Sequence, residues 1–267
     1  MALPLPSKDS TCLVTGASSG IGADIARELA KRGHGVTLVA RREDRLRELA
    51  TELEATGVRA EVVACDVSDE KARRRMVDTI AERGLKVEVL VNNAGYGSGG
   101  LFQELDADSE VAMVEVNCVA LTALCAIYVP QMVERGRGAV LNVGSTAGEQ
   151  PLPRQATYSA TKAFVNTFSD ALGADLNGTG VTVTSLRPGP VTSEFGDVAG
   201  ISDELFGAPA FAIKTPEETA AAAVDALDTG RRTVAPGIVA KVATIRGRMT
   251  PRTLLLPLLR RNYPVGK

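Results

Sequence analysis

Tyr158 and Lys162 are the two side chains whose types and spacing are best suited to chemistry. Residues four apart lie on one face of a helix, so the phenol and the ammonium are expected to be neighbours. A free tyrosine titrates near ~10, which makes it a poor proton donor or acceptor at neutral pH. A nearby ammonium stabilises the phenolate and so lowers the phenol's pKa. For this pair alone, two side chains on a solvated helix face remain the simpler explanation.

A glycine-rich segment near the N-terminus predicts a phosphate-binding turn. The sequence TGASSGIG, residues 15–22, follows an apolar run at residues 12–14 and leads into an amphipathic helical pattern at residues 23–29. In such a strand–turn–helix unit, glycines let the backbone approach a pyrophosphate while the helix N-terminus faces its charge. The spacing is Gly-x-x-x-Gly-x-Gly and not the commoner Gly-x-Gly-x-x-Gly. An ordinary glycine-rich turn is the alternative.

Two further polar positions follow apolar runs. Residues 92–95, with the sequence NNAG, come directly after the run at residues 87–91, at the predicted end of a buried strand. Ligands bind at such ends in open α/β sheets. Ser145 stands two residues past another run, at residues 139–143, and thirteen residues before Tyr158. Each of these segments alone would be interpreted as an ordinary turn. Their positions in the sequence ahead of Tyr158 and Lys162 make them candidate site residues.

Taken in order and spacing, these motifs resemble those of the short-chain dehydrogenase/reductase family over about residues 10–235. The motifs are TGASSGIG, Asp66-Val67, NNAG, Asn117, Ser145, YSATK and Pro188-Gly189-Pro190-Val191-Thr192. The segments VARRED and ATKAFVNTF are also similar to those of bacterial members near the long-chain β-ketoacyl and mycolate-type reductases.

The alternation of short apolar runs with helix-length amphipathic segments predicts an α/β fold. We expect a single Rossmann-type doubly wound parallel sheet of about seven strands with helices on both faces. Strands are predicted at residues 11–15, 36–40, 61–65, 87–91, 139–143, 181–187 and 232–235, and helices at 43–55, 70–83 and 109–134. The 267 residues are expected to form one dinucleotide-binding catalytic domain, with a substrate lid at about 192–215 and a basic apolar extension at about 236–267.

The resemblance implies a role for each motif residue. Tyr158 would be the general acid that protonates a substrate carbonyl oxygen as hydride reaches the carbon. Lys162 would hold the nicotinamide ribose and lower the tyrosine pKa, Ser145 would hydrogen-bond the same carbonyl oxygen, and Asn117 would hold a water that links Lys162 to solvent. The implied cofactor contacts are Gly16, Ser18, Ser19, Gly20, Ile21, Gly22, Arg41, Arg42, Asp66, Val67, Asn93, Ala94, Gly95, Tyr158, Lys162, Pro188, Gly189, Val191 and Thr192.

The residues after the second predicted strand indicate the cofactor. NAD-preferring enzymes tend to carry an acid there for the ribose 2′-hydroxyl, whereas arginine suits the 2′-phosphate of NADP(H). Here Ala40 stands at that position and Arg41 and Arg42 follow, so NADP(H) is expected, with Arg41 as the main contact. The alternative is that both arginines begin a solvated helix face. Asp66 would bind the adenine amino group, and its alternative is to cap the next helix, a role that Ser68 or Asp69 would fill better.

An apolar substrate is expected from the lid and from two residues near the cleft. The expected pocket residues are Tyr96, Leu152, Phe195, Leu205, Phe206 and Phe211. An ordinary surface excursion with a small core of its own is the alternative for the lid. Together these features predict an NADPH-dependent reductase of an apolar carbonyl compound, which could be an acyl chain of lipid metabolism. An NADP-dependent alcohol dehydrogenase working in the oxidative direction, or a nucleotide-binding regulator on the same fold, is the alternative.

Composition excludes several other classes. Net charge is −2, which gives no argument for nucleic acid, and no run of eighteen apolar residues or signal peptide is apparent. The four cysteines lack metal-binding spacing and are expected to be buried thiols in a reducing compartment, so a cytoplasmic location is predicted. The single histidine, His34, lies in a Gly-His-Gly turn where we expect it to be solvated. Neither a metal site nor a histidine-based mechanism is predicted.

The last 39 residues combine basic charge with apolar side chains. Residues 229–267 contain nine Lys or Arg and no Asp or Glu, so residues 1–228 carry a net charge of −11. Five leucines lie between Leu254 and Leu259, and we expect them to pack on the acidic body or on a partner subunit. Contact with an anionic membrane surface is the alternative. Many family members end instead in a glycine-rich strand that helps to form a tetramer. Because this chain continues with the basic apolar segment in place of such an ending, a homodimer is expected as well as a homotetramer.

Overall fold

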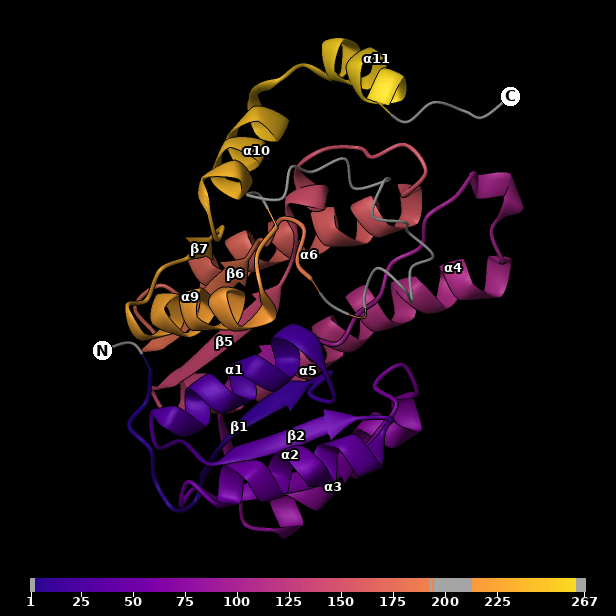
Figure 1. Cartoon of the computed structure of the whole chain (residues 1–267). Helices are drawn as coiled ribbons and strands as arrows, with labels where there is room; N and C mark the ends of the chain where they lie inside the picture. The colour runs from indigo at the N-terminus through magenta and orange to yellow at the C-terminus, as the bar shows by residue number, and fades with distance from the viewer. Residues whose placement is uncertain (1–2, 193, 195–212, 263–267) are drawn as a thin grey trace.

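Seven parallel strands form one sheet in the computed structural model, which describes residues 3–192, 194 and 213–262 (Figure 1). The strands are β1 (Ser10–Thr15), β2 (Val36–Ala40), β3 (Ala60–Ala64), β4 (Lys86–Asn92), β5 (Gly138–Val143), β6 (Val181–Leu186) and β7 (Thr233–Val234). Their order is β3-β2-β1-β4-β5-β6-β7, so the winding reverses between β1 and β4. Such a switch point opens a crevice at the carboxyl ends of the two strands. The doubly wound parallel sheet is therefore confirmed.

Helices cover both faces of this sheet because its strands are apolar on both sides. The core on one face includes side chains of α1 (Gly20–Lys31), α2 (Glu43–Glu54) and α9 (Pro216–Asp228). The core on the other face is formed with α3 (Glu70–Glu82), α5 (Leu121–Glu134) and α6 (Ala156–Asp175). Alternate residues of one strand point to opposite faces, and the sheet therefore builds two cores from continuous apolar runs.

A single helical stretch precedes β5 and contains one irregular turn. It consists of α4 (Ala107–Val114), a π-helical segment at Glu115–Ala120 and α5. The stretch Ala107–Glu134 is the one described helix whose length and mean hydropathy, 1.9, would let it cross a membrane. Core helices of globular proteins meet the same test, and this helix buries Leu124, Tyr128 and Met132 against the sheet.

Short elements connect the remaining parts. Two 3₁₀ turns, η1 (Phe102–Glu104) and η3 (Thr146–Glu149), follow β4 and β5, and the helices α10 (Ile238–Met249) and α11 (Arg252–Asn262) follow β7.

The expectation of a solvated His34 is wrong. The imidazole exposes only 6 % of its surface because the turn folds back onto the body, and this burial lowers its pKa.

The C-terminal helices extend the domain beyond β7, on the side of the sheet edge near α6 (Figure 1). Of the described leucines in α11, Leu255 is buried at 2 % exposure, whereas Leu254, Leu256 and Leu258 are exposed. The expectation of packing on the body therefore holds for Leu255 and not for these three, for which packing on a partner subunit stays a prediction.

Candidate active site

A cavity of about 810 Å³ lies at the carboxyl ends of the strands, at the switch point of the sheet. Its lining includes these predicted site residues: Gly16, Ser18, Ser19, Gly20, Ile21, Arg41, Arg42, Asp66, Val67, Asn93, Ala94, Gly95, Tyr96, Ser145, Leu152, Tyr158, Lys162, Pro188, Gly189 and Val191. The predicted residues Gly22, Asn117 and Thr192 are described but do not line the cavity. Phe195, Leu205, Phe206 and Phe211 of the expected lid lie outside the described residues.

The glycine-rich turn is clamped to the end of β4. Thr15 Oγ1 accepts hydrogen bonds from the backbone amides of Asn93 and Ala94 at 3.0 and 3.1 Å. The Asn93 side-chain amide in turn donates to the carbonyl oxygens of Thr15 and Gly16. Gly22 is required by this packing, since a Cβ there would lie 2.3 Å from Asn93 Nδ2 and 2.5 Å from the Gly16 oxygen. Gly22 therefore shapes the turn and does not face the cavity.

Arg42, and not Arg41, is tied to the glycine-rich turn. Its guanidinium donates to the Ser18 hydroxyl at 3.0 Å and to the Ser19 hydroxyl at 2.8 Å. It also pairs with Glu194 at 3.0 Å, and Arg45 pairs with the same carboxylate at 2.6 Å. Hydrogen bonds from Arg45 and Arg42 lower the pKa of Glu194 to about 2. Arg41 also lines the cavity, so both guanidiniums stand where a phosphate could reach them.

Asp66 lies at the cavity wall just past β3. Its Oδ1 accepts hydrogen bonds from the Ser68 backbone amide at 2.9 Å and from the Ser68 hydroxyl at 2.6 Å. Asp69 caps α3 instead, accepting from the amides of Lys71 and Ala72. Because Asp69 fills the capping role, the carboxylate of Asp66 serves a tight turn at the cavity edge.

Tyr158 and Ser145 meet at the inner part of the cavity. Ser145 precedes the first residue of η3, and its hydroxyl accepts from the Ala147 amide at 3.0 Å. Burial raises the pKa of Tyr158 to about 12, and a hydrogen bond with Ser145 offsets part of that effect. The phenol of the chain by itself therefore keeps its proton at neutral pH.

Lys162 lies one helical turn after Tyr158 but interacts mainly with the sheet. Its Nζ donates to the Val143 carbonyl oxygen at 2.8 Å and lies 5.9 Å from the Tyr158 ring centroid. Burial lowers the pKa of Lys162 to about 8. Burial of the phenol dominates its pKa in the chain by itself, and the Lys162 ammonium donates to the backbone, so the expected lowering of the tyrosine pKa by this lysine stays a prediction.

Asn117 holds the loop after β4 from within the π-helical segment. Its Nδ2 donates to the Tyr96 carbonyl oxygen at 2.9 Å and to Thr161 Oγ1 at 3.0 Å, while its Oδ1 accepts from the Tyr96 amide. Such π turns are frequent at functional sites. The side chain thus fastens the Tyr96 loop to α6, beside the cavity and not in its lining. Its implied role in holding a water stays a prediction.

An apolar wall surrounds the phenol. Tyr96 and Leu152 pack on a small cluster formed by Met113, Ala147 and Tyr158. The cavity also has polar lining residues that the sequence interpretation missed, among them Gln150 and Gln155. Both stand between Ser145 and Tyr158 in the sequence, and that position between two candidates was the available signal.

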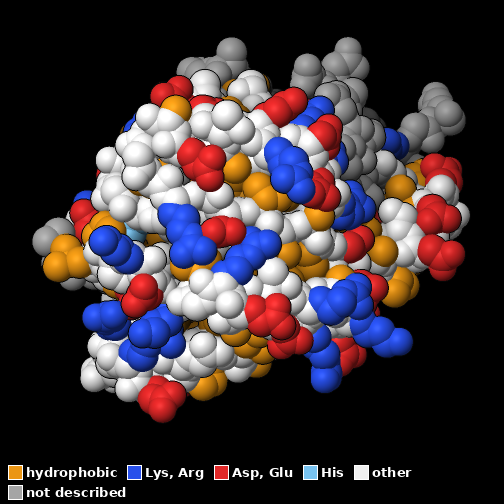
Figure 2. Space-filling view, turned by 90° about the horizontal axis from the view of Figure 1, so that it is seen from below, with side chains coloured by type: hydrophobic (Ala, Val, Ile, Leu, Met, Phe, Trp, Pro, Cys, Tyr) orange, Lys and Arg blue, Asp and Glu red, His pale blue; other side chains and the backbone are white. Residues whose placement is uncertain are grey.

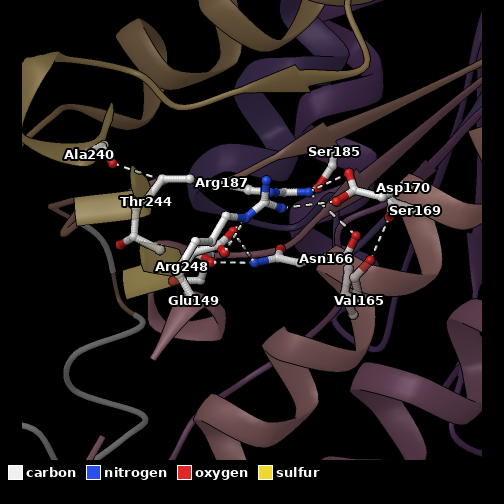
Figure 3. Close-up of polar contacts among 12 residues, drawn as sticks. Glu149, Val165, Asn166, Ser169, Asp170, Ser185, Arg187, Ala240, Thr244 and Arg248 are labelled. Carbon is white, nitrogen blue, oxygen red and sulfur yellow. Dashed lines mark hydrogen bonds and ion pairs between the residues drawn. The ribbon is translucent and has the colours of Figure 1, made fainter. Parts of the chain in front are cut away.

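A polar network surrounds the buried Arg187 (Figure 3). Arg187 is fully buried and pairs with Glu149 at 2.9 Å and Asp170 at 2.5 Å. Glu149 Oε1 also accepts from Asn166 Nδ2 at 3.0 Å, and that same amide donates to the Ser145 carbonyl oxygen at 2.9 Å. From α10, Arg248 reaches both carboxylates at 2.8 and 3.0 Å. The network therefore connects the Ser145 backbone to α6, β6 and the C-terminal extension.

Comparisons with known proteins agree with this architecture. A family model described as short chain dehydrogenase matches residues 10–200. Sulfoacetaldehyde reductase 2 of Chromohalobacter salexigens is 41 % identical over 202 residues, which cover 73 % of this chain and 79 % of the relative. Very-long-chain 3-oxoacyl-CoA reductase of Mycosarcoma maydis is 37 % identical over 187 residues, covering 68 % and 53 %.

A solved structure extends the match to nearly the whole chain. The short-chain dehydrogenase from Sphingobium yanoikuyae in complex with NADPH superposes with a TM-score of 0.79 at 32 % identity, covering 93 % of this chain and 95 % of that one. The sheet order, the cavity at its switch point and the family-model match over residues 10–200 all indicate the same family. The chain belongs to the short-chain dehydrogenase family.

Proposed function

We propose that the protein is an NADPH-dependent oxidoreductase that reduces the carbonyl of an apolar, acyl-chain substrate. The observation that carries the proposal is the convergence of Ser145, Tyr158 and Lys162 on one cavity whose far end is lined by the glycine-rich turn and two arginines. NADPH, when bound, supplies a hydride to the carbonyl carbon. This chain's own residues orient the carbonyl and supply the proton.

Tyr158 donates its proton to the carbonyl oxygen as negative charge develops there. Ser145 already hydrogen-bonds the phenol and offers a second contact to the same oxygen. Lys162, whose pKa of about 8 leaves it mostly charged at neutral pH, stabilises the phenolate left after proton transfer.

Arg42 is the proposed contact for the 2′-phosphate, together with Ser18 of the glycine-rich turn. A guanidinium presents a planar fork of donors that suits phosphate, and Ser18 already orients this one. The fit is supported by the absence of an acid at Ala40 and by the bound NADPH in the Sphingobium relative. Asp66, Asn93 and Gly95 are proposed to contact the adenosine side of the cofactor.

The substrate class rests on the apolar wall that Tyr96 and Leu152 form next to Tyr158. The sulfoacetaldehyde reductase and the 3-oxoacyl-CoA reductase named above act on carbonyl substrates of different size and polarity. The lining of the cavity must therefore determine which substrate this chain takes. Each CH₂ group buried from water contributes about 0.8 kcal/mol, so kcat/KM should rise with acyl length.

A homodimer or homotetramer is the proposed assembly. A nucleotide-binding regulator is the alternative function, which the retained Tyr158 and Lys162 disfavour.

The test follows NADPH oxidation with 3-oxoacyl thioesters of increasing chain length, with sulfoacetaldehyde as the short polar comparison. The proposal expects kcat/KM to rise by roughly fourfold per added CH₂ until the pocket is filled. A preference for sulfoacetaldehyde would refute the acyl substrate while leaving the oxidoreductase intact. Failure to oxidise NADPH with any carbonyl compound would favour the regulator.

A further inference from the structure

The outer face of α10 carries a stripe of four large apolar side chains. Ile238, Val242, Ile245 and Met249 expose 77, 55, 59 and 78 % of their surfaces. Their spacing of four, three and four residues places them on one side of the helix. These four side chains form an apolar helix face that is turned to solvent, and this face is called the α10 stripe below.

The opposite side of α10 is firmly docked, so the exposure of the stripe is fixed by packing. Ala240 and Gly247, which lie opposite the stripe, are the buried residues of the helix. A Cβ at Gly247 would come within 2.9 Å of the Glu149 Cβ and carbonyl oxygen, so only glycine permits this approach. Arg248 adds ion pairs to Glu149 and Asp170. The helix therefore packs with its small residues and presents its large ones.

Basic residues border the α10 stripe. By helical geometry Lys241 and Arg246 flank it on its two sides, and the whole segment 229–267 contains nine Lys or Arg and no acid. The surface on the side of α2 and α3 differs, because Lys and Arg alternate there with Asp and Glu (Figure 2). A helix with an apolar face bordered by cations is the kind that lies in the plane of an anionic bilayer.

We propose that the α10 stripe docks the protein on an anionic phospholipid bilayer. The four apolar side chains enter the boundary between headgroups and acyl chains, while Lys241 and Arg246 contact lipid phosphates. A second copy of this chain suits the surface less well. A two-fold interface brings the same patch of both subunits together, so two acid-free basic segments would face one another. The bilayer supplies the opposite charge instead.

The experiment is co-sedimentation of the full chain with vesicles, either of phosphatidylcholine alone or of an equal mixture of phosphatidylcholine and phosphatidylglycerol. Wild type should bind the anionic vesicles at least tenfold more strongly than the neutral ones. Each cation near the surface is worth about 1 kcal/mol, or about fivefold, so Lys241→Gln/Arg246→Gln should lower the partition coefficient by roughly 25-fold. Ile245→Ser/Met249→Ser should lower it by at least about tenfold.

The matched control is Phe102→Ser/Val111→Ser, which removes two apolar side chains of 64 and 63 % exposure outside α10. This variant should bind vesicles as wild type does. Equal binding to both vesicle types, no binding, or wild-type binding by the stripe variant would overturn the proposal. Light scattering covers the remaining case: if Ile245→Ser/Met249→Ser halves the particle mass, the stripe is a subunit interface and the proposal is wrong.

Discussion

Replacing Glu149 by Gln should destabilise the fold far more than its position in a short surface turn implies. Glu149 exposes 6 % of its surface and is one of two carboxylates facing the fully buried Arg187. Gln keeps the shape but removes the charge, and its amide would place a donor against the donors of Arg187 or Arg248. Removing one partner of a buried ion pair costs ~3–5 kcal/mol. Because Asp170 still pairs with Arg187, we expect about 3 kcal/mol.

Urea unfolding measured by circular dichroism tests this value, with the slope m checked for constancy. Arg248→Gln is the matched control, because it breaks the other ion pair of Glu149 from a side chain that is half exposed. Partly exposed pairs contribute up to ~1 kcal/mol, so the control should lose no more than that. A loss below 1 kcal/mol in Glu149→Gln, or equal losses in both variants, would refute the view that Arg187 depends on this carboxylate.

Three further predictions concern the cofactor, pH and the C-terminal helix. Arg42→Ala should weaken NADPH binding by at least about tenfold, the scale of a charged hydrogen bond, and leave NADH binding unchanged in a fluorescence titration; an equal loss for both cofactors would contradict it. Since burial lowers the pKa of Lys162 to about 8, its charge is lost as pH rises through 8 and NADPH affinity should fall between pH 7 and 9.5; a flat profile would contradict this. The unfolded chain keeps that proton up to about 10.5, so between pH 8 and 10.5 this group's contribution to the free energy of unfolding rises with pH. Leu255→Ala should speed hydrogen exchange across α11 by removing its buried anchor, whereas Leu254→Ala should not, and equal effects would show that α11 is not docked through Leu255.

The strands could be predicted because their signal is local. Each strand of a parallel sheet is buried on both faces and therefore appears as a short continuous apolar run, such as Val36–Ala40, which the structure reproduces residue for residue. The candidate site could be located for a related reason. Ser145 stands two residues past β5, the tyrosine and lysine share one face of the following helix, and the resemblance of the ordered motifs to the short-chain dehydrogenase/reductase family predicts that the three form one site.

Features set by tertiary contacts could not be predicted. Arg187 looks in the sequence like the polar end of a strand, and its partner Glu149 lies 38 residues earlier in an unremarkable turn. Which arginine faces the glycine-rich turn depends on the backbone path after β2, so the sequence favoured Arg41 whereas the structure ties Arg42 to Ser18 and Ser19. His34 occupies a turn of solvated type, yet the way that turn folds back buries it.

The packing of the C-terminal helices is another feature that the sequence did not predict. Their leucines predicted packing, but in α11 only Leu255 of the described leucines is buried, and α10 packs through Ala240 and Gly247, of which Gly247 fits against Glu149 of η3 where a larger side chain would not. The large apolar residues of the α10 stripe are therefore left on the surface. No local pattern distinguishes the two faces of α10, because both are apolar in the sequence.

Pre-steady-state hydride transfer in Tyr158→Phe tests the central claim most directly. The variant keeps the ring and its packing but removes the proton that the phenol donates to the carbonyl oxygen. With NADPH and a long-chain 3-oxoacyl thioester, the single-turnover rate constant should fall by ~10² to 10⁴ while the Kd for NADPH stays unchanged. A rate constant close to that of wild type would contradict the assignment of Tyr158 as the general acid.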